Sequence, residues 1–162
     1  MERFEYEHFQ KFILNMTREM FDHFKYLAPV AHVLVTKHPE TGEPMDKPGI
    51  TTLLSTGFSN EQEKDNWAES IRVFCKKYDA IAIAIVNEAW AVEQQKDEKY
   101  IQPSKHPNRI EIVSVVFETS RFGSTMCCAN ITRNGDDVRL EEFSKPLQSN
   151  IGGRFSGFLR AD

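Results

Sequence analysis

The chain has 162 residues, 20 of them basic and 24 acidic, and a formal net charge of −4 at pH 7. This length fits one domain, 1–162, whose core needs no metal or disulfide, and the acidic balance argues against a nucleic-acid partner. No apolar run approaches the roughly 20 residues of a membrane span, and residues 1–10 lack the pattern of a secretory signal.

Cysteine and histidine spacing gives no metal or cofactor motif. The three cysteines form no CxxC pair, and their odd count is typical of reduced thiols in a cytoplasmic protein. The five histidines show neither HxH nor HExxH spacing, and the chain contains no GxSxG elbow and no P-loop. We therefore expect no metal, no cofactor and a cytoplasmic location.

The first predicted element is a long amphipathic helix over residues 3–27, which Pro29 is expected to end. Apolar residues at intervals of three and four predict its buried stripe, namely Phe9, Phe12, Ile13, Met16, Met20, Phe24 and Leu27. A stripe this long and aromatic also makes self-association through residues 3–27 one hypothesis.

A hairpin and a second helix are predicted next. Residues 30–37 and 50–56 are rich in β-branched residues, and the proline- and glycine-rich segment between them predicts a long exposed loop. Ser59 or Asn60 is expected to cap the following helix in a capping box. The predicted buried face of that helix consists of Trp67, Ile71, Phe74 and Tyr78.

Four more strands are predicted at 80–92, 109–119, 125–133 and 137–143, with Asn134-Gly135 as a type I′ turn between the last two. Residues 144–162 are glycine-rich but carry apolar side chains, so this tail is expected to dock. The order α-β-β-α-β-β-β-β predicts an α+β domain with a mostly antiparallel sheet of about six strands. Two main helices are expected on one face of it.

The segment AIAIAIVNEAWAV at 80–92 gives the first candidate site. Both faces of its first half are apolar, which predicts a central strand whose alanine face allows close approach of a helix. Glu88 and Trp90 then share a face where the strand leaves the core. They form either a ligand site, with Glu88 as general acid or base, or an ion pair of Glu88 with Arg109 or another cation across the sheet, with Trp90 covering the edge of the core.

Two polar segments add further candidates. The loop 93–108 brings His106 next to Arg109 and is either a recognition loop or a solvated connector stiffened by prolines. In the tail, Arg154, Arg160 and consecutive glycines could bind an anion, or the glycines could serve tight turns while aromatic residues fill a groove.

Three segments, VNEAWAV, PSKHPNRIEIV and GGRFSGFL, contain the motifs E-A-W, P-x-R-x-E and G-R-F. Together they resemble a set of small uncharacterised proteins of bacteria and their phages, over about the C-terminal half of the chain. The matching residues are Glu88, Ala89 and Trp90, then Pro107, Arg109 and Glu111, then Gly153, Arg154, Phe155, Phe158 and Leu159. Phe158 stands where the set has an aliphatic residue. The resemblance implies a bacterial or phage origin but no activity, and it adds Glu111 to the candidate binding residues.

The leading hypothesis is a non-catalytic protein that binds a small ligand or a protein partner at Glu88, Trp90, Arg109, Glu111 and Arg154. The first alternative is a small hydrolase or lyase, in which Glu88 is the general acid or base, Arg109 neutralises an anion and His106 shuttles a proton. The second alternative is a self-associating structural protein.

Overall fold

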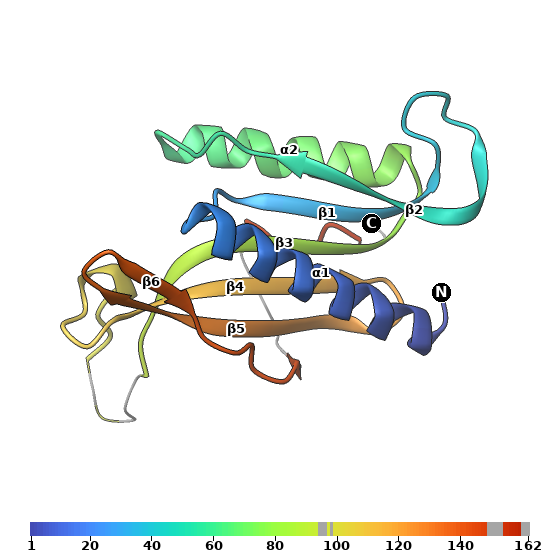
Figure 1. Cartoon of the computed structure of the whole chain (residues 1–162). Helices are drawn as coiled ribbons and strands as arrows, with labels where there is room; N and C mark the ends of the chain where they lie inside the picture. Colours follow the sequence, from blue (N-terminus) through green and yellow to red (C-terminus); the bar gives the residue numbers. More distant parts are fainter. Residues whose placement is uncertain (94–96, 98, 149–153, 160–162) are drawn as a thin grey trace.

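The predicted element order and the α+β class are confirmed by the computed structural model, which describes residues 1–93, 97, 99–148 and 154–159 (Figure 1). The first half contains α1 (Arg3–Phe24), β1 (Val30–Lys37), β2 (Pro44–Leu54), α2 (Glu61–Lys77) and β3 (Ala80–Ala91). The second half contains the short 3-10 helix η1 (Pro103–Lys105), β4 (Ile110–Thr119), β5 (Gly123–Asn134), β6 (Asp137–Leu140) and β7 (Leu147–Gln148). Within the described residues, neither long helix is apolar enough to cross a membrane.

All strands belong to one curled antiparallel sheet in the order β2-β1-β3-β4-β5-β6, and β7 adds to β5. The alanine- and isoleucine-rich β3 is central, as predicted, because it pairs with β1 on one side and β4 on the other. The edges are β2 and, at the other end, β6.

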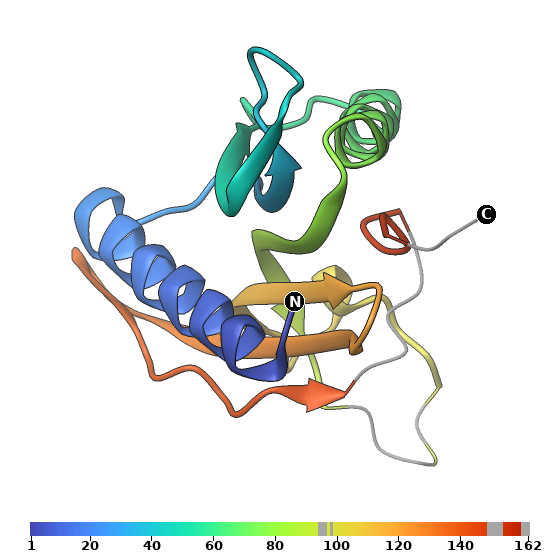
Figure 2. The same ribbon diagram turned by 90° about the vertical axis from the view of Figure 1, so that its right-hand side faces the viewer.

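The two helices cover opposite faces of this sheet, so the expectation that both lie on one face is wrong (Figure 2). Ala82 and Ala84 of β3 pack in the core under α1, while Ile83 and Ile85 pack in the core under α2. The reason is that a strand with two apolar faces leaves both faces of the sheet to be covered.

The buried stripe of α1 is rotated relative to the predicted one. Phe12 and Phe24 are exposed, Met16 and Met20 are half-buried, and two polar residues take part in the buried face. That face consists of Tyr6, Phe9, Gln10, Ile13, Thr17 and Phe21. Apolar periodicity misplaces the stripe because Gln10 and Thr17 are buried through hydrogen bonds rather than through apolar character.

The ends of both helices have local causes. Lys25 adopts a left-handed backbone with φ 62°, and its N–H donates to the Phe21 carbonyl at 2.7 Å. This cap ends α1 at Phe24, so Pro29 does not end the helix as predicted. The Asn60 side chain accepts from the Glu63 N–H at 2.9 Å and caps α2.

The start of β2 and the turn between β5 and β6 also differ from the prediction. β2 begins at Pro44 within the expected loop, because an edge strand tolerates prolines. In the β5–β6 hairpin, Asn134 pairs with Asp137, so the central turn residues are Gly135 and Asp136. Gly135 alone has a positive φ, 60°, which fits a type II′ rather than a type I′ turn.

The close approach of α1 to β3 leads to a first prediction. Ala84 is fully buried in the core under α1, so Ala84→Leu should lower the free energy of unfolding by about 2 kcal/mol through overpacking. Urea denaturation monitored by circular dichroism measures this. Ala89→Leu is the control, since Ala89 is only half-buried, and an equal loss in both variants would contradict close packing at Ala84.

Candidate functional site

Three of the residues predicted to form a site come together where β3 and β4 extend beyond α1. Trp90 and Glu111 are direct cross-strand partners, and the Arg109 guanidinium carbon lies 4.7 Å from the centre of the Trp90 ring. Glu111 forms an ion pair with Arg133 of β5. These residues line an open concavity of about 450 Å³, which we call the strand-end surface.

Glu88 contacts the backbone of a neighbouring segment rather than Arg109. Its carboxylate accepts a hydrogen bond at 2.8 Å from the backbone N–H of Leu27, just after α1. Within the described chain no ion pair joins Glu88 to Arg109, which stacks on Trp90 instead. Glu88 therefore fixes the path of the chain between α1 and β1, and it does not line the strand-end surface.

His106 and Arg154 lie in separate environments. His106 is 4% exposed, and its Nδ1 accepts from the Asn108 N–H at 3.0 Å, so it organises the loop before β4. The Arg154 guanidinium bridges Glu61 at 2.7 Å and Asp65 at 2.5 Å on α2. The other tail arginine, Arg160, lies outside the described residues.

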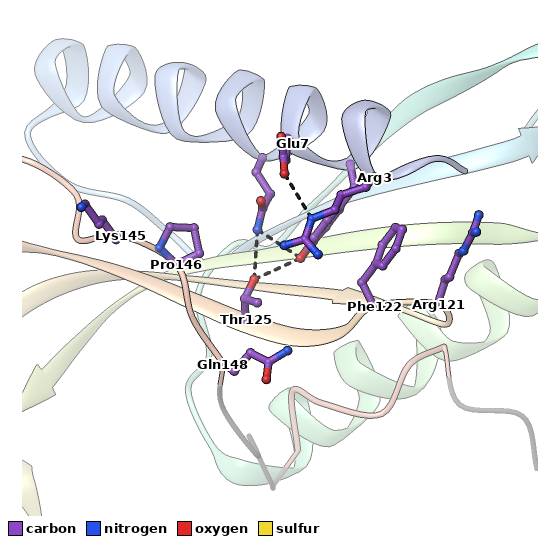
Figure 3. Close-up of a pocket in the computed structure, with 10 residues that line it drawn as sticks. Arg3, Glu7, Arg121, Phe122, Thr125, Lys145, Pro146 and Gln148 are labelled. Atoms are coloured by element: carbon purple, nitrogen blue, oxygen red, sulfur yellow. Dashed lines mark hydrogen bonds and ion pairs between the residues drawn. The ribbon is translucent and has the colours of Figure 1, made fainter.

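A larger cavity, about 700 Å³, opens between the first half of α1 and β5 (Figure 3). We call it the α1–β5 pocket. Three separate stretches of chain build it: the start of α1, the β4–β5 turn with β5, and the segment that leads into β7. Its lining residues are Arg3, Tyr6, Glu7, Gln10, Arg121, Phe122, Thr125, Lys145, Pro146 and Gln148.

The floor of the α1–β5 pocket is a buried polar network. The Gln10 amide nitrogen donates to the Thr125 hydroxyl at 3.0 Å and to the Tyr6 hydroxyl at 3.1 Å. The Tyr6 and Thr125 hydroxyls are themselves 3.0 Å apart. Burial raises the pKa of the Tyr6 phenol, although its hydrogen bond with Thr125 acts in the opposite direction. The phenol is therefore neutral at pH 7 and serves as a fixed hydrogen-bonding group.

The rim of this pocket is mostly cationic. Arg3, Arg121 and Lys145 line it, against one carboxylate, Glu7, which pairs with Arg3 at 3.3 Å. Arg121 also donates to the Met1 carbonyl at 3.0 Å and holds the start of the chain beside the turn. Arg121 pairs with Glu2 at 3.4 Å as well, so among the described residues Lys145 is the rim cation with no ion-pair partner.

An apolar wall completes the pocket. The Phe122 ring stacks on the Tyr6 ring at 5.5 Å between centroids, and Pro146 lines the cavity from the segment before β7. Rings and a proline fixed in this way offer flat apolar surface to a ligand body.

None of the pocket residues was a sequence-based candidate, because they are scattered from residue 3 to residue 148 and form no motif. One signal was present. Tyr6, Gln10 and Thr17 follow each other on the inner face of α1, and such polar residues at buried spacing indicate hydrogen-bonding partners in the fold.

Metal and thiol chemistry find no support in the part of the chain that the structure describes. No group of three or more histidine, cysteine, aspartate or glutamate side chains there could hold a metal ion. Burial raises the pKa of the Cys75 thiol to about 12 and that of the Cys127 thiol to about 11. Neither thiol is therefore an activated nucleophile at neutral pH.

Comparisons with protein-family models, with curated proteins and with solved structures find no match to this chain.

Proposed function

We propose that this is a non-catalytic binding protein that holds a small anionic ligand with a flat apolar body in the α1–β5 pocket. The observation that carries the proposal is the combination of a buried polar floor, an apolar wall and a cationic rim in one cavity of about 700 Å³. Ligand sites are typically cavities of about this size with a few fixed polar groups.

Each part of the pocket has a chemical counterpart in the ligand. The Lys145 and Arg121 side chains favour a carboxylate or phosphate at the mouth, and the Phe122 wall favours a planar body. The Thr125 hydroxyl and the Gln10 amide offer hydrogen bonds at the inner end. This arrangement binds and orients a ligand.

Catalysis is not favoured by this geometry. Among the described residues, the lining of the pocket contains no histidine or cysteine, and Glu7 is paired with Arg3. For the hydrolase or lyase alternative, Glu88 would have to leave the Leu27 N–H before it could act as an acid or base.

The cellular setting is part of the proposal. Cys75, Cys127 and Cys128 are free thiols, which supports a reducing compartment such as the cytoplasm. A bacterial or phage origin is supported by the sequence resemblance alone.

A charge reversal at the rim tests the proposal. Lys145 is exposed, so Lys145→Glu should leave the fold intact and weaken binding of phenyl phosphate by about tenfold or more. Isothermal titration calorimetry measures the affinity. Lys47→Glu, on the far edge strand β2, makes the same change in net charge and should leave the affinity unchanged. Equal effects of both variants, or no saturable binding of phenyl phosphate or benzoate to the wild type, would contradict the proposal.

A further inference from the structure

The edge strand β2 offers an unusually open surface for strand pairing. Among the described residues it pairs only with β1, and Figure 1 shows it at the border of the sheet. The register with β1 is regular from Val30↔Leu54 to Val35↔Gly49, so no bulge twists this part of the edge away. Its outer backbone groups therefore form a straight row that another strand can meet.

One hydrogen bond shows which backbone groups of β2 point away from the sheet. The Ser55 N–H donates to the Pro29 carbonyl at 3.2 Å, which makes these two residues a hydrogen-bonded pair of the antiparallel ladder. Hydrogen-bonded and non-hydrogen-bonded pairs alternate along the ladder, so the backbone N–H and C=O groups of residues 49, 51 and 53 also point toward β1. Ile50, Thr52 and Leu54 consequently direct their N–H and C=O groups outward.

The side chains along this edge give it no protection. The stretch from residue 49 to residue 54, GITTLL, contains no charge and no proline, and Lys47 and Pro48 lie before it. Leu54 is 72% exposed, beside Phe24 and Tyr26, which are 55% and 62% exposed. We call these three residues the Leu54 patch. Natural sheet edges are normally guarded by charges, prolines or bulges, and an unguarded apolar edge marks a pairing surface.

We propose that β2 pairs antiparallel with β2 of a second copy of this chain, about a two-fold axis through Thr52. This register sets Thr52 opposite Thr52 and Ile50 opposite Leu54, so that outward backbone groups meet as hydrogen-bonded pairs. Apolar side chains then face apolar ones, and the two threonines form a favourable cross-strand pair. Lys47 comes opposite Gly57, so no like charges meet.

A second copy suits this surface better than an unrelated strand because the surface is self-complementary. Each copy supplies the Ile50 that covers the Leu54 patch of the other, at both ends of the axis. The dimer joins two sheets into one and buries the end of α1 near Phe24. Self-association then uses β2 with the last turn of α1 rather than the whole of residues 3–27. The α1–β5 pocket, on the other side of the sheet's centre, stays open.

Sedimentation velocity on the full chain tests the dimer. The wild type should sediment with about twice the 18.7 kDa chain mass at tens of micromolar protein. The double variant Ile50→Lys/Leu54→Lys should sediment as a monomer, since the register sets the new lysines against each other. The variant Ile50→Lys/Leu54→Glu should recover the dimer, because each introduced lysine then faces a glutamate.

Circular dichroism establishes that both variants are folded, and Leu147→Lys, a lysine at another exposed leucine, should leave the dimer intact. A wild type that remains monomeric at high concentration would overturn the proposal. A dimer that persists in the double-lysine variant would also overturn it. Failure of the lysine–glutamate variant to recover the dimer would overturn the proposed register.

Discussion

Glu118→Ala should release residues 154–159 from the sheet and lower the free energy of unfolding by about 4 kcal/mol, the largest effect expected in this chain. Glu118 is 5% exposed, and its two carboxylate oxygens accept from the N–H groups of Gly157 and Leu159, each at 2.8 Å. Those bonds hold Phe158 in the core under α2. Without the carboxylate, the two N–H groups lose their charged acceptor, and Phe158 loses the hydrogen bonds that position it.

Hydrogen–deuterium exchange and urea denaturation measure the two parts of this effect. Residues 154–159 should exchange much faster in Glu118→Ala, while α1 and β3 stay protected. Glu118→Gln keeps one acceptor and should give an intermediate loss, and Glu142→Ala, at an exposed glutamate, should give almost none. Unchanged exchange in the tail of Glu118→Ala would show that the tail is held by other contacts.

His32 should make the protein less stable in mild acid. It is 1% exposed in β1, its Nδ1 lies 2.9 Å from the Thr52 hydroxyl, and its Nε2 has no hydrogen-bond partner within the described residues. Burial lowers its pKa from 6.5 to about 4. Below pH 6.5 the unfolded chain therefore binds a proton at His32 that the native chain does not bind. The contribution of neutral His32 to stability is fully present above that pH. The free energy of unfolding then falls by about 3 kcal/mol as the pH drops to 4.

Urea denaturation at pH 7.5 and pH 5 measures this dependence. His32 should account for about 2 kcal/mol of the loss between these two values. That contribution should vanish in His32→Gln, whatever the absolute stability of the variant. It should persist in His23→Gln, because His23 is exposed. Identical pH profiles for the wild type and His32→Gln would contradict a neutral buried His32.

The sequence predicts the strands of this fold better than it predicts the partners of single residues. Alternation identifies β3 as a central strand, because burial on both faces needs only the pattern of alanine and isoleucine. The same pattern cannot find the partner of Glu88, since that partner is a backbone N–H, of Leu27, which every residue type carries. The pairing of Trp90 with Glu111 is likewise not visible in the sequence pattern and follows only from the register of β3 with β4.

The α1–β5 pocket cannot be predicted from the sequence, for a different reason. Gln10 and Thr125 meet only after α1 packs on β5, and 115 positions separate them in the chain. Predicting that contact requires the helix rotation, which apolar periodicity misjudges when hydrogen-bonded polar residues replace apolar ones on the inner face.

The most direct test of the proposed function is a ¹H–¹⁵N NMR titration of the wild-type protein with benzoate and with its neutral match benzamide. Benzoate should shift the amide signals of Phe122 and Thr125 and the side-chain amide signals of Gln10, saturably and far more than benzamide does. Shifts that cluster around Trp90 and Arg109, or equal shifts with both compounds, would contradict an anion-binding α1–β5 pocket.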